Sequence, residues 1–147
     1  MSYVQSLFHV VLNTKHQEMS INPDESGRLF AYMIGVLIKN DCIVLAINGI
    51  PNHIHILLSL SSSKALSDVI RDLKRASSHW MKESGRYPIF KGWSKEFASF
   101  SLSYTHKDAV ASYIQNQQEH HKELNFESEY QNLILKNGLV FYKIPED

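Results

Sequence analysis

Two histidines separated by one residue are the most distinctive chemical feature of the sequence. His53-Ile54-His55 lies in an apolar run that is typical of a β-strand. Because residues two apart on a strand point to the same face, we expect the two imidazoles to lie side by side and to supply half of a metal site. In a chain with eight histidines such a triplet arises readily by chance. Half-exposed strand histidines without a ligand are therefore the alternative.

A tyrosine and a glutamine four residues apart, Tyr113 and Gln117, share one face of a predicted helix. An aromatic residue on a helix face most often packs in the core, which is the alternative for Tyr113. Together with the histidine pair, however, these residues supply a phenol and an amide oxygen. A divalent cation held by His53, His55 and Gln117 would polarise a phosphate, and Tyr113 would attack the phosphorus of a phosphodiester. The sequence indicates no general base for the phenol.

The elements that must position these residues follow the order β-α-β-β-α-β-α. Strands are predicted over residues 3–13, 42–47, 53–60 and 97–104. Residues 48–52 form the turn of a hairpin. Helices are predicted from a cap at Asn22 to about Lys39, over 66–81, from a cap at Asp108 to about Glu123, and over 126–135.

This order is a split βαβ repeat, so the expected fold class is α+β, a ferredoxin-like antiparallel sheet with helices on one face. A further, tyrosine-bearing helix follows the last strand. Ile54, Ile56, Leu58 and Leu60 should pack beneath the two crossover helices, and the histidines should face the side that these helices leave open. No linker or repeat interrupts the chain, so residues 1–147 are expected to form one domain.

Composition excludes several classes of protein. A 147-residue chain with 44% hydrophobic residues is neither disordered nor collagen-like. Its one cysteine, Cys42, excludes a disulfide scaffold and a Cys-x-x-Cys zinc site. The longest apolar run, residues 29–38, is too short to cross a bilayer, and the first residues lack the basic start of a signal peptide. We therefore expect a soluble, cytoplasmic protein.

The formal charge is zero, but residues 64–95 hold eight basic and three acidic residues. Four of these basic residues lie opposite the apolar stripe of the second helix and are predicted to contact DNA phosphates: Arg71, Lys74, Arg75 and Lys82. An ordinary solvated face is the alternative. Three aromatic residues are candidates for stacking on unpaired bases, with core packing favoured for the last of them: Tyr87, Phe90 and Trp93.

The ordered set of motifs resembles the IS200/IS605-type single-tyrosine transposases of the His-hydrophobe-His (HUH) endonuclease superfamily. The resemblance is carried by His53-Ile54-His55 after a Pro-Asn turn and by Tyr113-Ile-Gln-Asn-Gln117. It extends over nearly the whole chain through segments 9–16, 93–103 and 126–138, the last of which is similar to relatives associated with repetitive extragenic palindromes.

The resemblance implies a homodimeric enzyme that binds hairpins of single-stranded DNA. Such an enzyme cleaves DNA with a tyrosine and Mg²⁺ or Mn²⁺, leaves a 5′-phosphotyrosine and a free 3′-OH, and rejoins strands. By position, Tyr113 would be the nucleophile, and His53, His55 and Gln117 the metal ligands. The tyrosine helix often serves the partner subunit's histidine pair, which would give two composite sites.

A non-catalytic module that only binds hairpin nucleic acid remains the alternative, although an inactive descendant need not keep all four site residues. A hydrolytic phosphoesterase with two His-x-Ser/Thr motifs is excluded because the sequence contains no such motif. Two imidazoles and an amide oxygen suit Mn²⁺ at least as well as Mg²⁺, so the sequence leaves the metal open.

Overall fold

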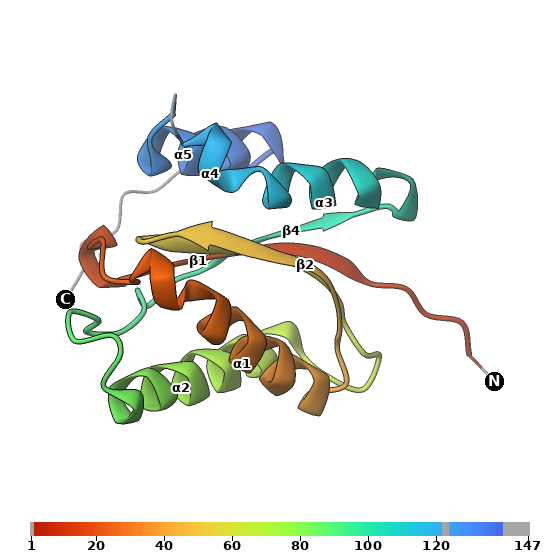
Figure 1. The fold of residues 1–147 in the computed structure, drawn as a ribbon. Coiled ribbons are helices and arrows are strands. Elements are labelled where there is room, and N and C mark those ends of the chain that lie inside the picture. Colours follow the sequence, from red (N-terminus) through yellow and green to blue (C-terminus); the bar gives the residue numbers. More distant parts are fainter. Residues whose placement is uncertain (1, 122–123, 140–147) are drawn as a thin grey trace.

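The computed structural model describes residues 2–121 and 124–139, which form an antiparallel sheet between two layers of helices (Figure 1). The four strands are β1 (Leu7–Asn13), β2 (Ile43–Ile50), β3 (His53–Ser59) and β4 (Ala98–Leu102). One face is covered by α1 (Ser26–Lys39) and α2 (Leu66–Ser84). The other face is covered by α3 (Lys107–Gln115), α4 (Gln117–His120) and α5 (Phe126–Lys136).

The strand order β2-β3-β1-β4 confirms the predicted fold class. Strand β3 lies between β1 and β2 and is antiparallel to both, which is the arrangement of a split βαβ unit. Several boundaries differ from the prediction. The first strand begins at Leu7, although the carbonyl of Ser6 still accepts from the amide of Leu60 at 2.8 Å. The hairpin turn is only residues 51–52, because β2 continues to Ile50. Strand β4 is shorter than the predicted 97–104, and α2 extends beyond residue 81 to Ser84.

The face of the sheet beneath α1 and α2 holds the larger hydrophobic core. Ile54, Ile56 and Leu58 alternate along β3 and are fully buried against both helices, as predicted. The start of the first helical segment also agrees with the sequence. The side chain of Asn22 accepts a hydrogen bond from the amide of Asp24 at 3.0 Å, and a short 3₁₀ turn leads into α1.

The aromatic residues after α2 belong to this core. Tyr87 and Phe90 are 3% and 5% exposed, so the prediction that they are exposed and stack on bases is wrong. Trp93 packs edge-to-face on Phe90, and its indole N–H donates to Ser77 Oγ at 3.0 Å, which confirms core packing. The burial of Tyr87 and Phe90 could not be predicted from the sequence, because the Gly and Pro residues around them are typical of an exposed loop.

On the opposite face, the predicted helix 108–123 is wrong in two respects. The helix is interrupted at Asn116, which separates α3 from α4, and α4 ends at His120. Asp108 is not the cap, because the helix begins one residue earlier and Asp108 lies in its first turn. The rest of that prediction, residues 122–123, lies outside the described residues. The predicted C-terminal helix is confirmed as α5.

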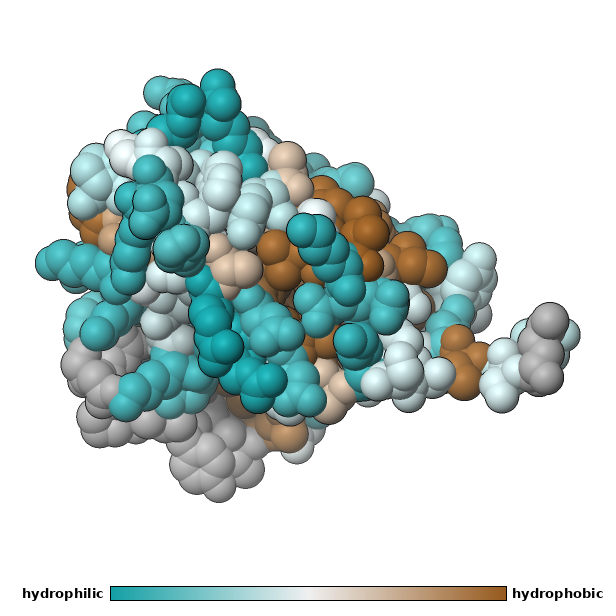
Figure 2. Space-filling view, turned by 90° about the horizontal axis from the view of Figure 1, so that it is seen from below, coloured by the Kyte–Doolittle hydropathy of each residue, from teal (hydrophilic) through white to brown (hydrophobic). Residues whose placement is uncertain are grey.

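Figure 2 shows the face formed by α1 and α2. Most of this face is hydrophilic, and hydrophobic residues gather towards the side from which the N-terminal residues extend. Among the described residues, no helix has the length and apolar character needed to cross a membrane.

The close approach of β2 to β3 beside the histidine pair gives a test of the fold. A Cβ added at Gly49 would lie 2.9 Å from Ile54 Cα and would also meet the carbonyl oxygen of His53, whereas a Cβ at Gly35 in α1 meets nothing within 4 Å. We predict that Gly49→Ala lowers the free energy of unfolding by about 1–3 kcal/mol. The matched control Gly35→Ala should raise it by about 0.5–1 kcal/mol. Urea denaturation measures both, and equal stability of the two variants would contradict the register.

Candidate active site

The histidine pair lies at the centre of the sheet face covered by α3, α4 and α5. His53 and His55 are both fully buried, with ring centroids 5.0 Å apart, so they share one face of β3 as predicted. The alternative of two half-exposed histidines is wrong. The helices α1 and α2 do leave this face open, but the C-terminal helices close it (Figure 1).

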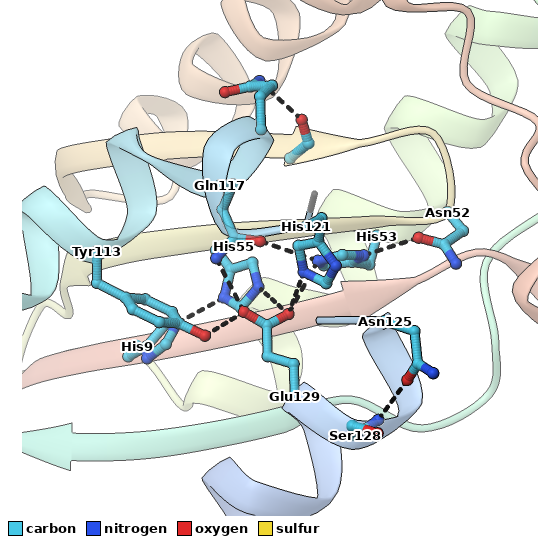
Figure 3. A network of polar contacts seen from close by, with 12 residues as sticks. His9, Asn52, His53, His55, Tyr113, Gln117, His121, Asn125, Ser128 and Glu129 are labelled. Atoms are coloured by element: carbon cyan, nitrogen blue, oxygen red, sulfur yellow. Dashed lines mark hydrogen bonds and ion pairs between the residues drawn. The ribbon is translucent and has the colours of Figure 1, made fainter. Parts of the chain in front are cut away.

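A carboxylate from α5 meets both imidazoles (Figure 3). Glu129 Oε1 lies 3.2 Å from the Nε2 atoms of His53 and His55 and 2.7 Å from Nε2 of His121. Glu129 is 1% exposed. Local sequence explains how it arrives there: Asn125 caps α5 by accepting from the amide of Ser128, and Phe126 stacks on the His53 ring with centroids 4.0 Å apart. Glu129 therefore projects into the site from the first turn of α5.

Tyr113 and Gln117 reach the same carboxylate from above the sheet. The Tyr113 hydroxyl donates to Glu129 Oε2, and the Gln117 amide N–H donates to that oxygen at 2.9 Å. The amide oxygen of Gln117 lies 3.1 Å from His53 Nε2. The interruption at Asn116 does not separate the two residues, because both side chains still point into the site (Figure 3). All four residues that the sequence singled out are thus brought together.

The outer nitrogens of the two imidazoles also have partners. His53 Nδ1 lies 2.8 Å from Oδ1 of Asn52, the last residue of the hairpin turn. His55 Nδ1 lies 2.7 Å from Nε2 of His9, which reaches it from β1. The rings are therefore held on one side by the sheet and on the other by the helices.

Burial sets the charge of the site. Burial, together with the neighbouring His55, lowers the pKa of His9 to about 3, and burial lowers the pKa of His53 to about 4. Both are therefore neutral at pH 7. Burial also acts to raise the pKa of Glu129, but its hydrogen bonds with His53 and His55 outweigh burial and hold that pKa far below its usual range. The site thus contains an ionised carboxylate beside the neutral imidazole of His53.

Burial, and next the adjacent Glu129 carboxylate, raise the pKa of Tyr113 well above its usual range. The phenol is therefore protonated in the structure as described. Its deprotonation would require positive charge that offsets the charge of the carboxylate.

The donor set fits a divalent cation. One nitrogen of His53, one of His55 and a carboxylate oxygen of Glu129 all lie within 4.8 Å of one another, and all three side chains are buried. Neutral imidazoles with a carboxylate and an amide oxygen are suitable ligands for Mn²⁺ and related ions. This set includes both histidines that were predicted as ligands. It also offers a second candidate oxygen ligand, Glu129, beside the predicted Gln117.

The predicted DNA-binding residues lie on α2, across the sheet from the site (Figure 1). Arg75 and Lys82 are exposed, and Arg71 pairs with Asp68 and Asp72 at 3.2 and 3.9 Å. Lys74 is half-buried, and its Nζ donates to the carbonyls of residues 94, 95 and 96 at 2.9–3.1 Å. Lys74 therefore holds the segment before β4, whatever else it contacts.

Four contributors to the site were not predicted: Glu129, His121, His9 and Asn52. Glu129 and His9 lie in segments that fitted the family resemblance, which was the only signal for them. Asn52 falls in the predicted hairpin turn, and His121 in the predicted helix that starts at Asp108, so neither position indicated a site residue. No spacing rule connects α5 to β3, because their contact depends on the tertiary packing of Phe126.

Comparison with known proteins identifies the family and the fold. The family model described as "Transposase IS200 like" matches residues 2–117. The ISDra2 transposase TnpA of Deinococcus radiodurans is 25% identical over 129 residues, which cover 82% of this chain and 89% of that protein. The family match ends at Gln117, so Glu129 and α5 lie beyond it.

Two solved structures share the fold. A crystal structure of a chain from Deinococcus radiodurans R1, described as a transposase, has a TM-score of 0.63 and 21% identity and covers 80% of this chain and 95% of that one. A REP-associated tyrosine transposase bound to a REP hairpin has a TM-score of 0.63 and 16% identity and covers 82% of this chain and 72% of that one. With the family model matching most of its length, this chain belongs to the IS200-like transposase family.

Proposed function

We propose that this transposase is a metal-dependent enzyme that cleaves and rejoins single-stranded DNA through a 5′-phosphotyrosine at Tyr113. One observation carries the proposal: the Tyr113 hydroxyl, the histidine pair and two oxygen donors converge on one buried cluster. A tyrosine that only packs in the core does not require a hydrogen bond to a carboxylate, and a site that only binds a metal does not require a phenol. The presence of both groups in one cluster therefore favours an enzyme in which the tyrosine reacts.

In the proposed reaction, the Tyr113 oxygen attacks the phosphorus of the DNA backbone. A bond forms between the phenol oxygen and phosphorus, the bond from phosphorus to the 3′-oxygen breaks, and that oxygen leaves as a free 3′-OH after taking up a proton. Glu129 Oε2 accepts the phenol hydrogen bond and so orients the hydroxyl. The phenol proton is released to water, and the departing 3′-oxygen takes up a proton from water. A Mg²⁺ or Mn²⁺ ion bound in the site would supply positive charge that lowers the phenol pKa and polarises the phosphate.

His53 and His55 would hold this cation through Nε2, with Gln117 Oε1 and Glu129 Oε1 as the oxygen ligands. The Gln117 side chain donates its amide N–H to Glu129 Oε2, which is the carboxylate oxygen not used as a ligand. Gln117 is thereby oriented with its oxygen towards His53. The carboxylate in turn divides its two oxygens between the histidines and the tyrosine.

The proposed substrate is single-stranded DNA that folds into hairpins. The structural neighbour of similar fold that is bound to a REP hairpin supports this choice. The exposed basic residues of α2, Arg71, Arg75 and Lys82, are proposed to contact phosphates. Lys74 is not included, because its three N–H donors are used by the carbonyls of residues 94, 95 and 96. Since the exposed basic residues lie across the sheet from the site, such contacts would require the DNA to extend around an edge of the sheet.

A homodimer is also proposed. All groups of the site lie within one chain in this structure, because Tyr113 is beside its own His55, with ring centroids 5.7 Å apart. The exchange of the tyrosine helix between subunits is the other arrangement. Both arrangements use the same residues, so they differ in which chain supplies Tyr113.

The nucleophile is tested with a labelled DNA hairpin and Mn²⁺. The wild-type protein should form an adduct that survives denaturation, and Tyr113→Phe should reduce it more than about 1,000-fold while hairpin affinity changes little. Tyr104→Phe, which alters an exposed tyrosine, is the matched control and should retain the adduct. An undiminished adduct in Tyr113→Phe would exclude this residue. Hairpin binding without any adduct in the wild type would favour the non-catalytic module.

The ligand set is tested by titration of Mn²⁺, followed by electron paramagnetic resonance. The double variant His53→Ala/His55→Ala should lose binding, and Glu129→Gln and Gln117→Leu should each weaken it by about 10-fold or more. Glu127→Gln, an exposed carboxylate in the same turn of α5, is the control. Wild-type affinity in both Glu129→Gln and Gln117→Leu would show that neither oxygen is a ligand.

Complementation distinguishes the two arrangements of the site. Tyr113→Phe is mixed with His53→Ala/His55→Ala, and adduct formation is measured after subunit exchange. Because Tyr113 contacts its own histidine pair here, we predict no recovery. Recovery of a substantial fraction of wild-type adduct would mean that the tyrosine serves the partner's histidines.

A further inference from the structure

Both ring nitrogens of His53 face hydrogen-bond acceptors, although a neutral imidazole can donate from only one of them. Its Nδ1 faces Asn52 Oδ1 at 2.8 Å, and its Nε2 faces Gln117 Oε1 at 3.1 Å and Glu129 Oε1 at 3.2 Å. All three partners are acceptors, whereas a neutral imidazole has one N–H. One ring nitrogen must therefore point its lone pair at an oxygen, unless something positive takes that lone pair.

A second proton would let both ring nitrogens donate, but it would leave no lone pair for a cation. The arrangement is complete when Nδ1 carries the proton and gives it to Asn52, and Nε2 gives its lone pair to a cation. Asn52 is suited to this role because it ends the turn that leads directly into β3. Its side-chain oxygen is thus next to the ring that it orients.

His55 presents a related choice between two arrangements. Its Nδ1 lies 2.7 Å from His9 Nε2, and its Nε2 lies 3.2 Å from Glu129 Oε1. In one arrangement, Nε2–H donates to the carboxylate and Nδ1 accepts from His9. In the other, Nδ1–H donates to His9, and the Nε2 lone pair is free for a cation. Only the second arrangement allows His55 to be a ligand through the nitrogen that faces the site.

His9 is well placed to accept from His55. It is 5% exposed, and its ring packs at steep angles against Phe100 and Tyr113, with centroids 5.9 and 6.0 Å away. It belongs to β1, which pairs directly with β3 along its length. The sheet therefore fixes the distance between the two rings, and His9 can change the direction of its hydrogen bond without moving.

We propose that Asn52 and His9 are positioning residues that hold both imidazoles as Nδ1–H tautomers with Nε2 turned towards the cation. In the metal-free site, the carboxylate of Glu129 favours a proton on His55 Nε2. Cation binding then reverses the hydrogen bond between His9 and His55. The proton in that bond passes from His9 Nε2 to His55 Nδ1, the proton on His55 Nε2 is released where the cation would bind, and His9 takes up a proton at Nδ1, so both rings stay neutral. The inference rests on the proposed function, because it assumes that a divalent cation binds the pair. Partners of this kind outside the ligand set are worth about 10–100-fold in metal affinity.

The experiment measures Mn²⁺ affinity on the full chain, with circular dichroism to verify that each variant folds. His9→Phe and Asn52→Leu remove the acceptors and should each weaken Mn²⁺ binding by about 10-fold or more. Asn52→Asp can only accept, so it should keep affinity within a few-fold of the wild type. His79→Phe changes an exposed histidine on α2 and is the control for His9→Phe.

The tautomers are read by two-bond ¹H–¹⁵N correlation spectra of histidine-labelled protein, with Zn²⁺ as a diamagnetic probe. We expect His55 to change from the Nε2–H to the Nδ1–H form on Zn²⁺ binding, and His53 to be Nδ1–H in the loaded protein. Unchanged Mn²⁺ affinity in folded His9→Phe and Asn52→Leu, or an Nε2–H form of either ligand in the loaded protein, would overturn the inference and leave the proposed function intact. A wild-type protein that binds neither ion would contradict both.

Discussion

The site depends on the hydrogen bonds that surround the buried carboxylate of Glu129. A buried negative charge is costly unless it is paired and hydrogen-bonded, and this one is satisfied by contributions from three separate elements. His53 and His55 approach it from β3, Tyr113 from α3, and Gln117 from α4. The position of α5 is therefore linked to the conformation of the tyrosine and to the orientation of the amide.

The two faces of one strand explain how the protein combines a stable fold with a polar centre. Along β3, Ile54 and Ile56 point into the core beneath α1 and α2, whereas His53 and His55 point to the other face. A shift of register by one residue would exchange these faces. The core that holds α1 and α2 against the sheet therefore also fixes where the imidazoles lie.

Much of the fold was predictable because it depends on local periodicity. The alternation in β3 and the helical spacing of α2 are encoded within short segments, and they were confirmed. The interruption at Asn116 was missed because neither glycine nor proline marks it. The burial of Tyr87 and Phe90 was missed because their burial depends on distant contacts, such as the bond from the Tyr87 hydroxyl to the carbonyl of Glu25.

The site was predictable only in part, for a related reason. His53, His55, Tyr113 and Gln117 are recognisable by type and spacing, and the structure brings them together. Glu129 resembles an ordinary acidic residue in the first turn of a capped helix, a position where negative charge is common. Its burial follows from the docking of α5 through Phe126 onto Val11, Ala98 and Phe100, which no local pattern reveals.

We propose that this cluster binds a divalent cation between the histidine pair and the oxygens of Glu129 and Gln117. The decisive measurement is anomalous diffraction from a crystal of the full chain soaked in Mn²⁺. We expect a strong anomalous peak within coordination distance of both Nε2 atoms and of at least one of these oxygens. A site without a peak at saturating Mn²⁺, with the Glu129 carboxylate still hydrogen-bonded to both imidazoles, would contradict it.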